Sequence, residues 1–369
     1  GNAVLVGEAE GPPTAASPAM PRTPPPADST RESPEYTQFR SDIPLKVLTT
    51  GDAGDKEWKY YDAGPKDAES LPLVLLPGLS GTADSFFRQL QCLGPKGYRL
   101  ISVSYPGYRD LDVFLKEFLE LLDALSLPKV HLLGSSLGGF LAQYVAWKVP
   151  ERVQSLVLSN TFCSTAYYNE KSPCRDMFRM LPGFALRRMV LKSFPQGALP
   201  AEAASAVDFM LEELESIPRK VLAGRLYMNT MDLRVAGIKM EDEDVTIIST
   251  MDDTVVPRKL TLDLLSRFPV AKHAQMKSGG SFPYLSCADE FNLFVEIHLR
   301  NQHAKAHPEE YEEQQQQYES EEEVAQRLRD AAEGVNVGAS SSGVSSRAAP
   351  PQASSRGSLP MASPALSSQ

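Results

Sequence analysis

The stretch "HLLGSSLGGFLAQYVAW" at residues 131–147 decides the fold of this chain. It contains the pattern G-x-S-x-G, with Gly134, Ser136 and Gly138 at the fixed positions. An apolar run precedes the pattern and a helix-forming run follows it, which is the strand–turn–helix context of a nucleophile elbow. Such a turn presents the Ser136 hydroxyl at a helix N-terminus, where the N–H of Leu137 faces a developing oxyanion. The alternative interpretation is a plain glycine-rich turn between a strand and a helix.

Around this stretch, short apolar runs alternate with amphipathic helical patterns. The runs fit strands that are buried on both faces of a parallel sheet, and they occupy residues 71–77, 99–105, 129–134, 153–159 and 244–250. Residues 44–50 and 57–64 predict an opening antiparallel pair. The alternation predicts an α/β fold built in layers. It stops from about residue 162 to residue 239, where helical patterns predict a lid above the carboxyl ends of two core strands.

A second loop, "LLPGLSGTADSFFRQL" at residues 75–90, lies between a predicted strand and a predicted helix. Folds with a serine elbow place the second donor of the oxyanion hole in this loop, and the N–H of Leu79 is the candidate. An ordinary loop that is capped by Thr82 or Ser80 is the alternative.

An acidic turn follows the apolar run at 244–250, in the stretch "STMDDTVVPRKL" at residues 249–260. An acid in this place orients a catalytic histidine in such folds. Its spacing to the following Val-Val-Pro favours Asp253, and Asp252 is the second choice. Aspartate before a helix is also an ordinary N-cap or turn residue, which is the alternative for Asp253.

Such folds carry a catalytic triad in the order serine, acid and histidine, so the histidine that acts as general base is expected last along the chain. The stretch "SGGSFPYLSCADEFN" at residues 278–292 lies where the histidine loop is expected, and Ser281 occupies the histidine position. A hydroxyl does not accept a proton near neutral pH, so Ser136 lacks a general base. Loss of one triad member costs about 10⁴- to 10⁶-fold in rate. We expect surface or packing roles for all five histidines, which are His131, His273, His298, His303 and His307.

The composition argues against several other classes of function. The chain has 369 residues and a net charge of −10, and its sequence shows no basic stripe that would neutralise nucleic-acid phosphates. Four scattered cysteines without a C-x-x-C pair argue against zinc and predict reduced thiols in a cytosolic protein. No apolar run reaches the roughly 18 residues that span a bilayer. We therefore expect no metal, no cofactor and no nucleic-acid partner.

The two ends of the chain differ from its centre in composition. Residues 1–33 are rich in Pro, Ala and Ser, which predicts a disordered segment. Residues 304–369 begin with an acidic Gln/Glu-rich stretch that predicts a solvated helix, and they end in a Ser/Pro/Ala-rich stretch that predicts a disordered tail. The folded domain is therefore expected at residues 34–303.

The elbow, the Asp253 turn and the Ser281 stretch together resemble the α/β-hydrolase superfamily. Longer strings between about residues 33 and 303 are similar to the maspardin family: "FRSDIPLKVL" (39–48), "YYDAGP" (60–65), "SGTADSFFRQL" (80–90), "VHLLGSSLGGFLAQ" (130–143), "AVDFMLEELES" (206–216) and "SGGSFPYLSCADEFNLFVEIHL" (278–299). The resemblance implies an α/β-hydrolase fold. We expect a mostly parallel eight-stranded sheet, helices on both faces and a helical cap at about 162–239.

The same resemblance implies a cytosolic protein that associates peripherally with endosomal or trans-Golgi membranes and acts through protein partners in sorting. The family is atypical in its triad, so Ser281 agrees with a protein-binding adaptor without established catalysis. The alternative is a slow or unconventional serine hydrolase, esterase- or lipase-like, that uses Ser136, and a small acyl ligand suits either interpretation. Six cap side chains are expected to present a partner surface or to cover the pocket: Met177, Phe178, Met180, Leu181, Phe184 and Met189.

Overall fold

Eight strands form a single sheet in the part of the chain that the computed structural model describes, which is residues 30–51, 54, 56–68, 70–172 and 174–309. The strands are β1 (Lys46–Thr50), β2 (Lys56–Ala63), β3 (Leu73–Leu76), β4 (Leu100–Ser104), β5 (Val130–Ser136), β6 (Val153–Thr161), β7 (Val245–Thr250) and β8 (Lys272–Met276). They lie in the order β1-β2-β4-β3-β5-β6-β7-β8. All neighbours are parallel except β1 with β2 and β2 with β4, which are antiparallel. The predicted fold class and its opening antiparallel pair are confirmed.

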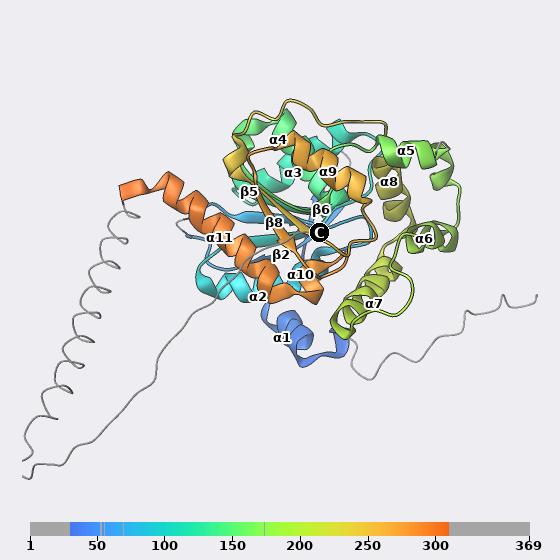
Figure 1. Cartoon of the computed structure of the whole chain (residues 1–369), viewed down its shortest axis with the longest axis horizontal. Coiled ribbons are helices and arrows are strands. Elements are labelled where there is room, and N and C mark those ends of the chain that lie inside the picture. The colour runs from blue at the N-terminus through green and yellow to red at the C-terminus, as the bar shows by residue number, and fades with distance from the viewer. Residues whose placement is uncertain (1–29, 52–53, 55, 69, 173, 310–369) are drawn as a thin grey trace, which may run out of the picture. The chain divides into compact units, whose positions relative to one another are not determined.

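Helices cover both faces of this sheet, as Figure 1 shows. Outside the cap they are α1 (Pro34–Asp42), α2 (Phe87–Leu93), α3 (Leu111–Ala124), α4 (Leu137–Lys148), α9 (Arg258–Arg267), α10 (Pro283–Ser286) and α11 (Ala288–Ala306). Short 3-10 helices are η2 (Ala83–Phe86), η3 (Gly94–Lys96), η4 (Pro150–Arg152) and η6 (Asp242–Asp244). One core joins the sheet to α3, α4 and α9 around Phe114 and Phe140. The other joins it to α1, α2 and α11 around Phe87 and Phe291.

The helix α3 shows how local sequence sets this packing. The carboxylate of Asp110 accepts the N–H of Asp112 at 2.8 Å and caps the start of the helix. Apolar residues at a spacing of three or four then place Phe114 and Phe118 on the sheet side, where both are fully buried. The helix therefore buries the apolar stripe that its sequence predicts.

A helical insertion between β6 and β7 forms the cap. Its helices are α5 (Ala166–Lys171), α6 (Gly183–Leu191), α7 (Ala201–Ser216) and α8 (Arg219–Asn229), with the 3-10 helix η5 (Arg175–Arg179). In Figure 1 they are the green to yellow-green elements beside the sheet. The segment that the sequence assigned to a lid is therefore mainly helical, and it leaves the sheet between two core strands.

The described residues begin inside the segment that the sequence predicts to be disordered. Thr30–Glu32 form the 3-10 helix η1, and the hydroxyl of Ser33 accepts the N–H of Tyr36 at 3.1 Å, which caps α1. The fold therefore includes these last residues of the segment. Residues 1–29 and 310–369 lie outside the described residues, so the disorder and the polar helix expected there stay predictions. None of the described helices has the length and apolar content to cross a bilayer.

Candidate active site

Ser136 lies on a strained turn between β5 and α4. Its backbone has φ 50° and ψ −120°, a positive φ that is uncommon for any residue other than glycine. A Cβ on Gly134 would collide with the backbone of Gly138, and a Cβ on Gly138 would collide with the backbone oxygen of Leu76. Only glycine fits at both positions, so the turn brings Ser136 to the start of α4 as its motif predicts.

A pocket of about 170 Å³ lies beside Ser136. Leu79, Asp253 and Ser281 also line it, so the structure brings together the predicted nucleophile, the acid position, the base position and one predicted oxyanion residue. Leu137, the other predicted oxyanion residue, directly follows Ser136 as the first residue of α4. Residues of α5, α6 and α8 complete the wall, so the cap lies over the pocket.

Ser281 and Asp253, which have the predicted positions of base and acid, form a hydrogen-bonded pair. The Ser281 hydroxyl donates to Asp253 Oδ1 at 2.7 Å, and Ser281 is only 6% exposed. Asp253 also accepts the N–H groups of Val255 at 2.9 Å and Val256 at 3.3 Å. Burial raises the pKa of Asp253 to about 6, and these hydrogen bonds oppose the rise. Asp253 therefore fits both interpretations that the sequence left open: it contacts the base position, and it closes a turn.

Asp252, the second choice for the acid, lies outside the Ser136 pocket. It is exposed, and its carboxylate accepts the N–H of Gly280 at 2.8 Å. The carbonyl oxygen of Gly280 accepts hydrogen bonds from Asn160 Nδ2 at 3.0 Å and Thr250 Oγ1 at 2.6 Å. Asp252 does not line the Ser136 pocket. It therefore holds the loop that carries Ser281 instead of facing the pocket.

All five histidines lie within the described residues, and none of them lines the Ser136 pocket. His131 Nδ1 and His298 Nε2 contact the hydroxyl of Ser155 at 2.6 and 2.7 Å. Burial lowers their pKa to about 4 and about 3, so both rings are neutral near pH 7. His131 lies five residues before Ser136 on β5, about 17 Å along the strand. His273 lies within β8 and contacts a β7 hydroxyl at 2.7 Å.

The six cap side chains singled out in the sequence divide between the surface and the interior. Met177, Met180 and Phe184 are exposed, whereas Phe178, Leu181 and Met189 pack against the core. Met189 also lines the Ser136 pocket. Only the three exposed members are therefore accessible enough for the expected partner surface, and Met189 is the member that covers the pocket.

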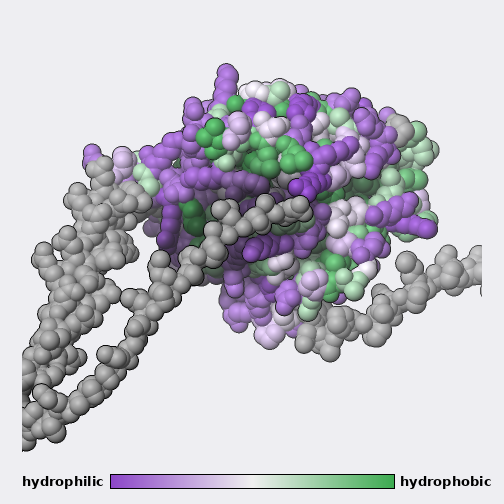
Figure 2. Space-filling view, viewed as in Figure 1, coloured by the Kyte–Doolittle hydropathy of each residue, from purple (hydrophilic) through white to green (hydrophobic). Residues whose placement is uncertain are grey.

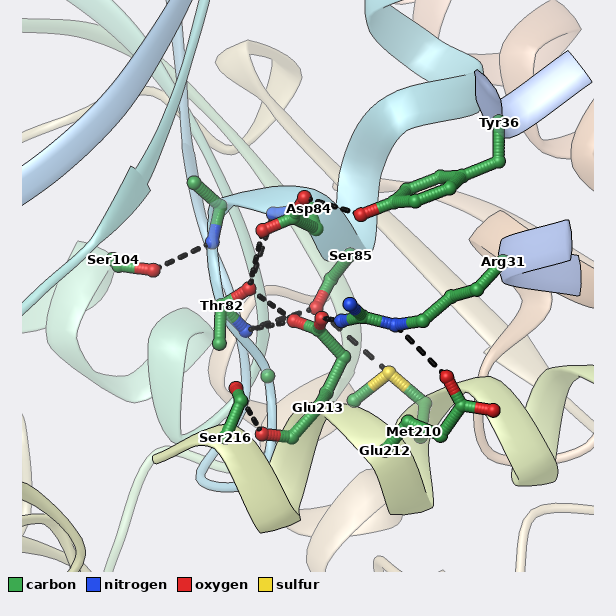
Figure 3. A network of polar contacts seen from close by, with 12 residues as sticks. Arg31, Tyr36, Thr82, Asp84, Ser85, Ser104, Met210, Glu212, Glu213 and Ser216 are labelled. Atoms are coloured by element: carbon green, nitrogen blue, oxygen red, sulfur yellow. Dashed lines mark hydrogen bonds and ion pairs between the residues drawn. The ribbon is translucent and has the colours of Figure 1, made fainter. Parts of the chain in front are cut away.

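A buried carboxylate of the cap holds residues 77–82, the loop of the predicted oxyanion donor Leu79 (the oxyanion loop; Figure 3). Glu213 of α7 is fully buried and accepts the N–H of Thr82 at 2.9 Å and the Thr82 hydroxyl as well. Arg31 of η1 forms an ion pair with the same carboxylate. Burial raises the pKa of Glu213 to about 7, the charge of Asp84 adds to the rise, and Arg31 and Thr82 oppose it. Loop, cap and η1 therefore meet at a carboxyl group that titrates near neutral pH.

A buried guanidinium of the cap holds the same loop. Arg225 of α8 is 1% exposed and donates to the carbonyl oxygens of Gly81 at 2.6 Å and Leu79 at 3.4 Å. It also donates to the carbonyl oxygen of Tyr105 at 2.7 Å. Neither Arg225 nor Glu213 was predicted from the sequence. Both lie on the buried face of their helix, so a charge at an apolar position of a helical pattern is the signal that would have found them.

Glu213 predicts a pH dependence of stability. Its pKa rises from 4.5 to about 7 on folding, so the folded chain holds the proton more tightly and stability falls as pH rises through this window. We expect Glu213→Gln, which keeps the shape without the charge, to remove this fall, which is on the order of 3 kcal/mol between pH 4.5 and pH 7. Thermal unfolding across a pH series measures it. Glu215→Gln, on the exposed side of α7, is the control, and an unchanged pH slope in Glu213→Gln contradicts the prediction.

Comparisons with known sequences place the chain among relatives of one fold. A family model described as alpha/beta hydrolase fold matches residues 72–223. Maspardin of Danio rerio is 43% identical over 276 residues, which cover 74% of this chain and 88% of that protein. Maspardin of Homo sapiens is 42% identical over 274 residues, which cover 73% of this chain and 88% of that protein.

Solved structures with low sequence identity share the fold. A hydrolase from Pseudomonas aeruginosa PA01 matches with a TM-score of 0.55 at 22% identity, over 69% of this chain and 98% of that one. The enol-lactonase from Burkholderia xenovorans LB400 matches with a TM-score of 0.56 at 16% identity, over 69% of this chain and 100% of that one. The fold, the elbow and the sequence relatives lead to one conclusion: the chain belongs to the maspardin family of proteins with the α/β-hydrolase fold.

Proposed function

We propose that this chain is a binding protein on a hydrolase fold, which acts in the cytoplasm as an adaptor or regulator in endosomal or trans-Golgi sorting. The observation that carries the proposal is the 2.7 Å hydrogen bond between Ser281 and Asp253, which takes the place of a histidine–acid pair. The Ser281 hydroxyl is not basic enough to take a proton from Ser136, so the elbow keeps only a weak nucleophile. The sorting role follows from the resemblance to the maspardin family.

A slow serine hydrolase is the second candidate, and the intact elbow favours it. Ser136 keeps a φ of 50°, a conformation that costs about 1–3 kcal/mol. The adjoining pocket of about 170 Å³ has room for a small acyl group. In this alternative a water molecule or a bound partner supplies the base, or Ser136 binds the acyl ligand without turnover.

Ester turnover by the full chain separates the two candidates. We expect the wild-type chain and Ser136→Ala to hydrolyse a series of p-nitrophenyl esters at the same low rate, because a missing base costs at least about 10⁴-fold. A fluorophosphonate probe reports in parallel whether Ser136 is reactive. Ser136→Ala should also capture the same protein partners as the wild type. Turnover that vanishes in Ser136→Ala contradicts the adaptor proposal and supports the hydrolase.

A further inference from the structure

A second pocket, of about 410 Å³, opens where η5, the start of α8 and the loop between β4 and α3 meet. It shares no lining residue with the Ser136 pocket. Its lining includes two acidic residues, Asp110 and Asp176, and six basic ones: Lys56, Arg109, Arg175, Arg179, Arg219 and Lys220. This basic pocket therefore gathers positive charge in a chain whose net charge is −10.

Close packing fixes the floor of the basic pocket. Gly107 and Gly224 meet backbone to backbone, and a Cβ on either glycine would collide with the other segment. The ring of Tyr227 lies near the guanidinium groups of Arg109 and Arg175, which are 5.0 and 5.3 Å from its centroid. The loop after β4, η5 and α8 are therefore held around one space.

The carboxylates of the basic pocket are already engaged. Asp176 pairs with Arg109, and Asp110 caps α3. Within the described part of the chain, three cations of the pocket form no ion pair with a carboxylate: Arg175, Arg179 and Lys220. The first turn of α8 carries no acidic residue, although the helix dipole favours negative charge there. A bound anion would relieve the mutual repulsion of these cations.

Exposed apolar side chains lie on the wall of the basic pocket or in the cap segments that continue from its lining residues. Met177 lies in η5 between two of the cations, and Met180 follows η5; they are 50% and 75% exposed. Phe184 in α6 is 74% exposed, and Val113 on the pocket wall is 42% exposed. Figure 2 also shows apolar and hydrophilic residues side by side at the edge that the cap helices form. A membrane covers such side chains while its headgroups meet the cations, whereas a free phosphate leaves them in water.

We propose that the basic pocket binds the phosphorylated headgroup of an anionic lipid, while Met177, Met180 and Phe184 enter the membrane interface. The inference rests on the proposed role in endosomal or trans-Golgi sorting, for which it names a membrane contact, and it does not depend on the chemistry of Ser136. The positive charge of the pocket is complementary to an anionic headgroup. The exposed apolar side chains favour a lipid surface over a free anion as the ligand.

Sedimentation of the full chain with vesicles tests the proposal. Phosphatidylcholine vesicles that contain a minority of a phosphatidylinositol monophosphate are compared with phosphatidylcholine alone, and inorganic phosphate and a soluble inositol phosphate serve as free ligands. We expect binding to the phosphoinositide vesicles only. Arg175→Glu with Arg179→Glu should lower the partition coefficient about thirty-fold or more, and Met180→Ser with Phe184→Ser about tenfold.

The matched control makes the same change of charge on the cap outside the pocket. Arg188 and Lys192 are exposed and do not line the basic pocket. Arg188→Glu with Lys192→Glu should lower binding less than about threefold, since it changes only the overall charge. An equal loss in the control pair overturns the pocket as the binding site. Thermal unfolding at the wild-type temperature shows that each variant is folded.

The remaining outcomes distinguish the sources of the anion. Binding of the soluble inositol phosphate or of inorganic phosphate without binding of vesicles overturns the lipid assignment. Capture of a protein through Met180 and Phe184 without vesicle binding overturns it as well. Ser136→Ala should bind vesicles like the wild type, so ester turnover would contradict the adaptor proposal while leaving the lipid site intact.

Discussion

Ser281→His is expected to raise Ser136-dependent ester hydrolysis about 10²- to 10³-fold over the wild-type chain. An imidazole at this position would donate Nδ1–H to Asp253, as the Ser281 hydroxyl does at 2.7 Å, and present Nε2 to the pocket that Ser136 lines. Backbone N–H groups of Val255 and Val256 already hold the Asp253 carboxylate in place. On the proposed assignment of Ser136, Asp253 and Ser281, the substitution therefore supplies the missing base.

The pH profile identifies the new base. Turnover by Ser281→His should rise with pH as the imidazole loses its proton near its ordinary pKa of about 6.5, while the wild-type rate stays flat. Ser281→Asn, which fills similar space without basicity, is the matched control. A gain that survives Ser136→Ala in the same chain comes from the histidine itself and contradicts the prediction. No gain at all means that the oxyanion loop or the cap misplaces the ester.

Features that depend on neighbouring residues could be predicted from the sequence. The elbow needs glycines at two fixed positions beside Ser136, and the strands need short apolar runs, so both leave a local pattern. The pairing of Ser281 with Asp253 spans 28 residues, and it was predictable because the order of nucleophile, acid and base along such chains is fixed. The turn role of Asp253 was also predictable, but the sequence could not show that both roles coincide.

Features that depend on distant partners could not be predicted. Glu213 and Thr82 are 131 residues apart, and Arg225 and Gly81 are 144 residues apart. Helical periodicity shows which face of a helix is buried, but it does not show which loop lies against that face. The basic pocket likewise draws its cations from separate segments, so no basic stripe is visible along the chain.

Arg225→Met is expected to lower the free energy of unfolding by about 3 kcal/mol, which corresponds to a fall in Tm on the order of 10 °C. The methionine fills the space of the stem but leaves the buried carbonyl oxygens of Gly81 and Tyr105 without their charged donor. Burial lowers the pKa of Arg225, so removal of the charge also relieves a desolvation cost, and this limits the expected loss. Lys220→Met, on the exposed side of α8, should change stability by less than about 0.5 kcal/mol. Thermal unfolding of Arg225→Met at the wild-type temperature contradicts the prediction.

Arg225→Lys tests whether this contact positions the oxyanion loop as well as stabilising it. A lysine keeps the charge, but its single ammonium group cannot reach the carbonyl oxygens of Gly81, Leu79 and Tyr105 together. If the contact places the Leu79 N–H, Arg225→Lys in the Ser281→His chain should lower kcat by about 10²-fold with little change in KM, as the loss of an oxyanion donor does. A purely structural role would lower Tm and leave kcat of the folded chain unchanged. The value of kcat, calculated per folded chain, therefore decides whether Arg225 positions the oxyanion loop or only stabilises the cap.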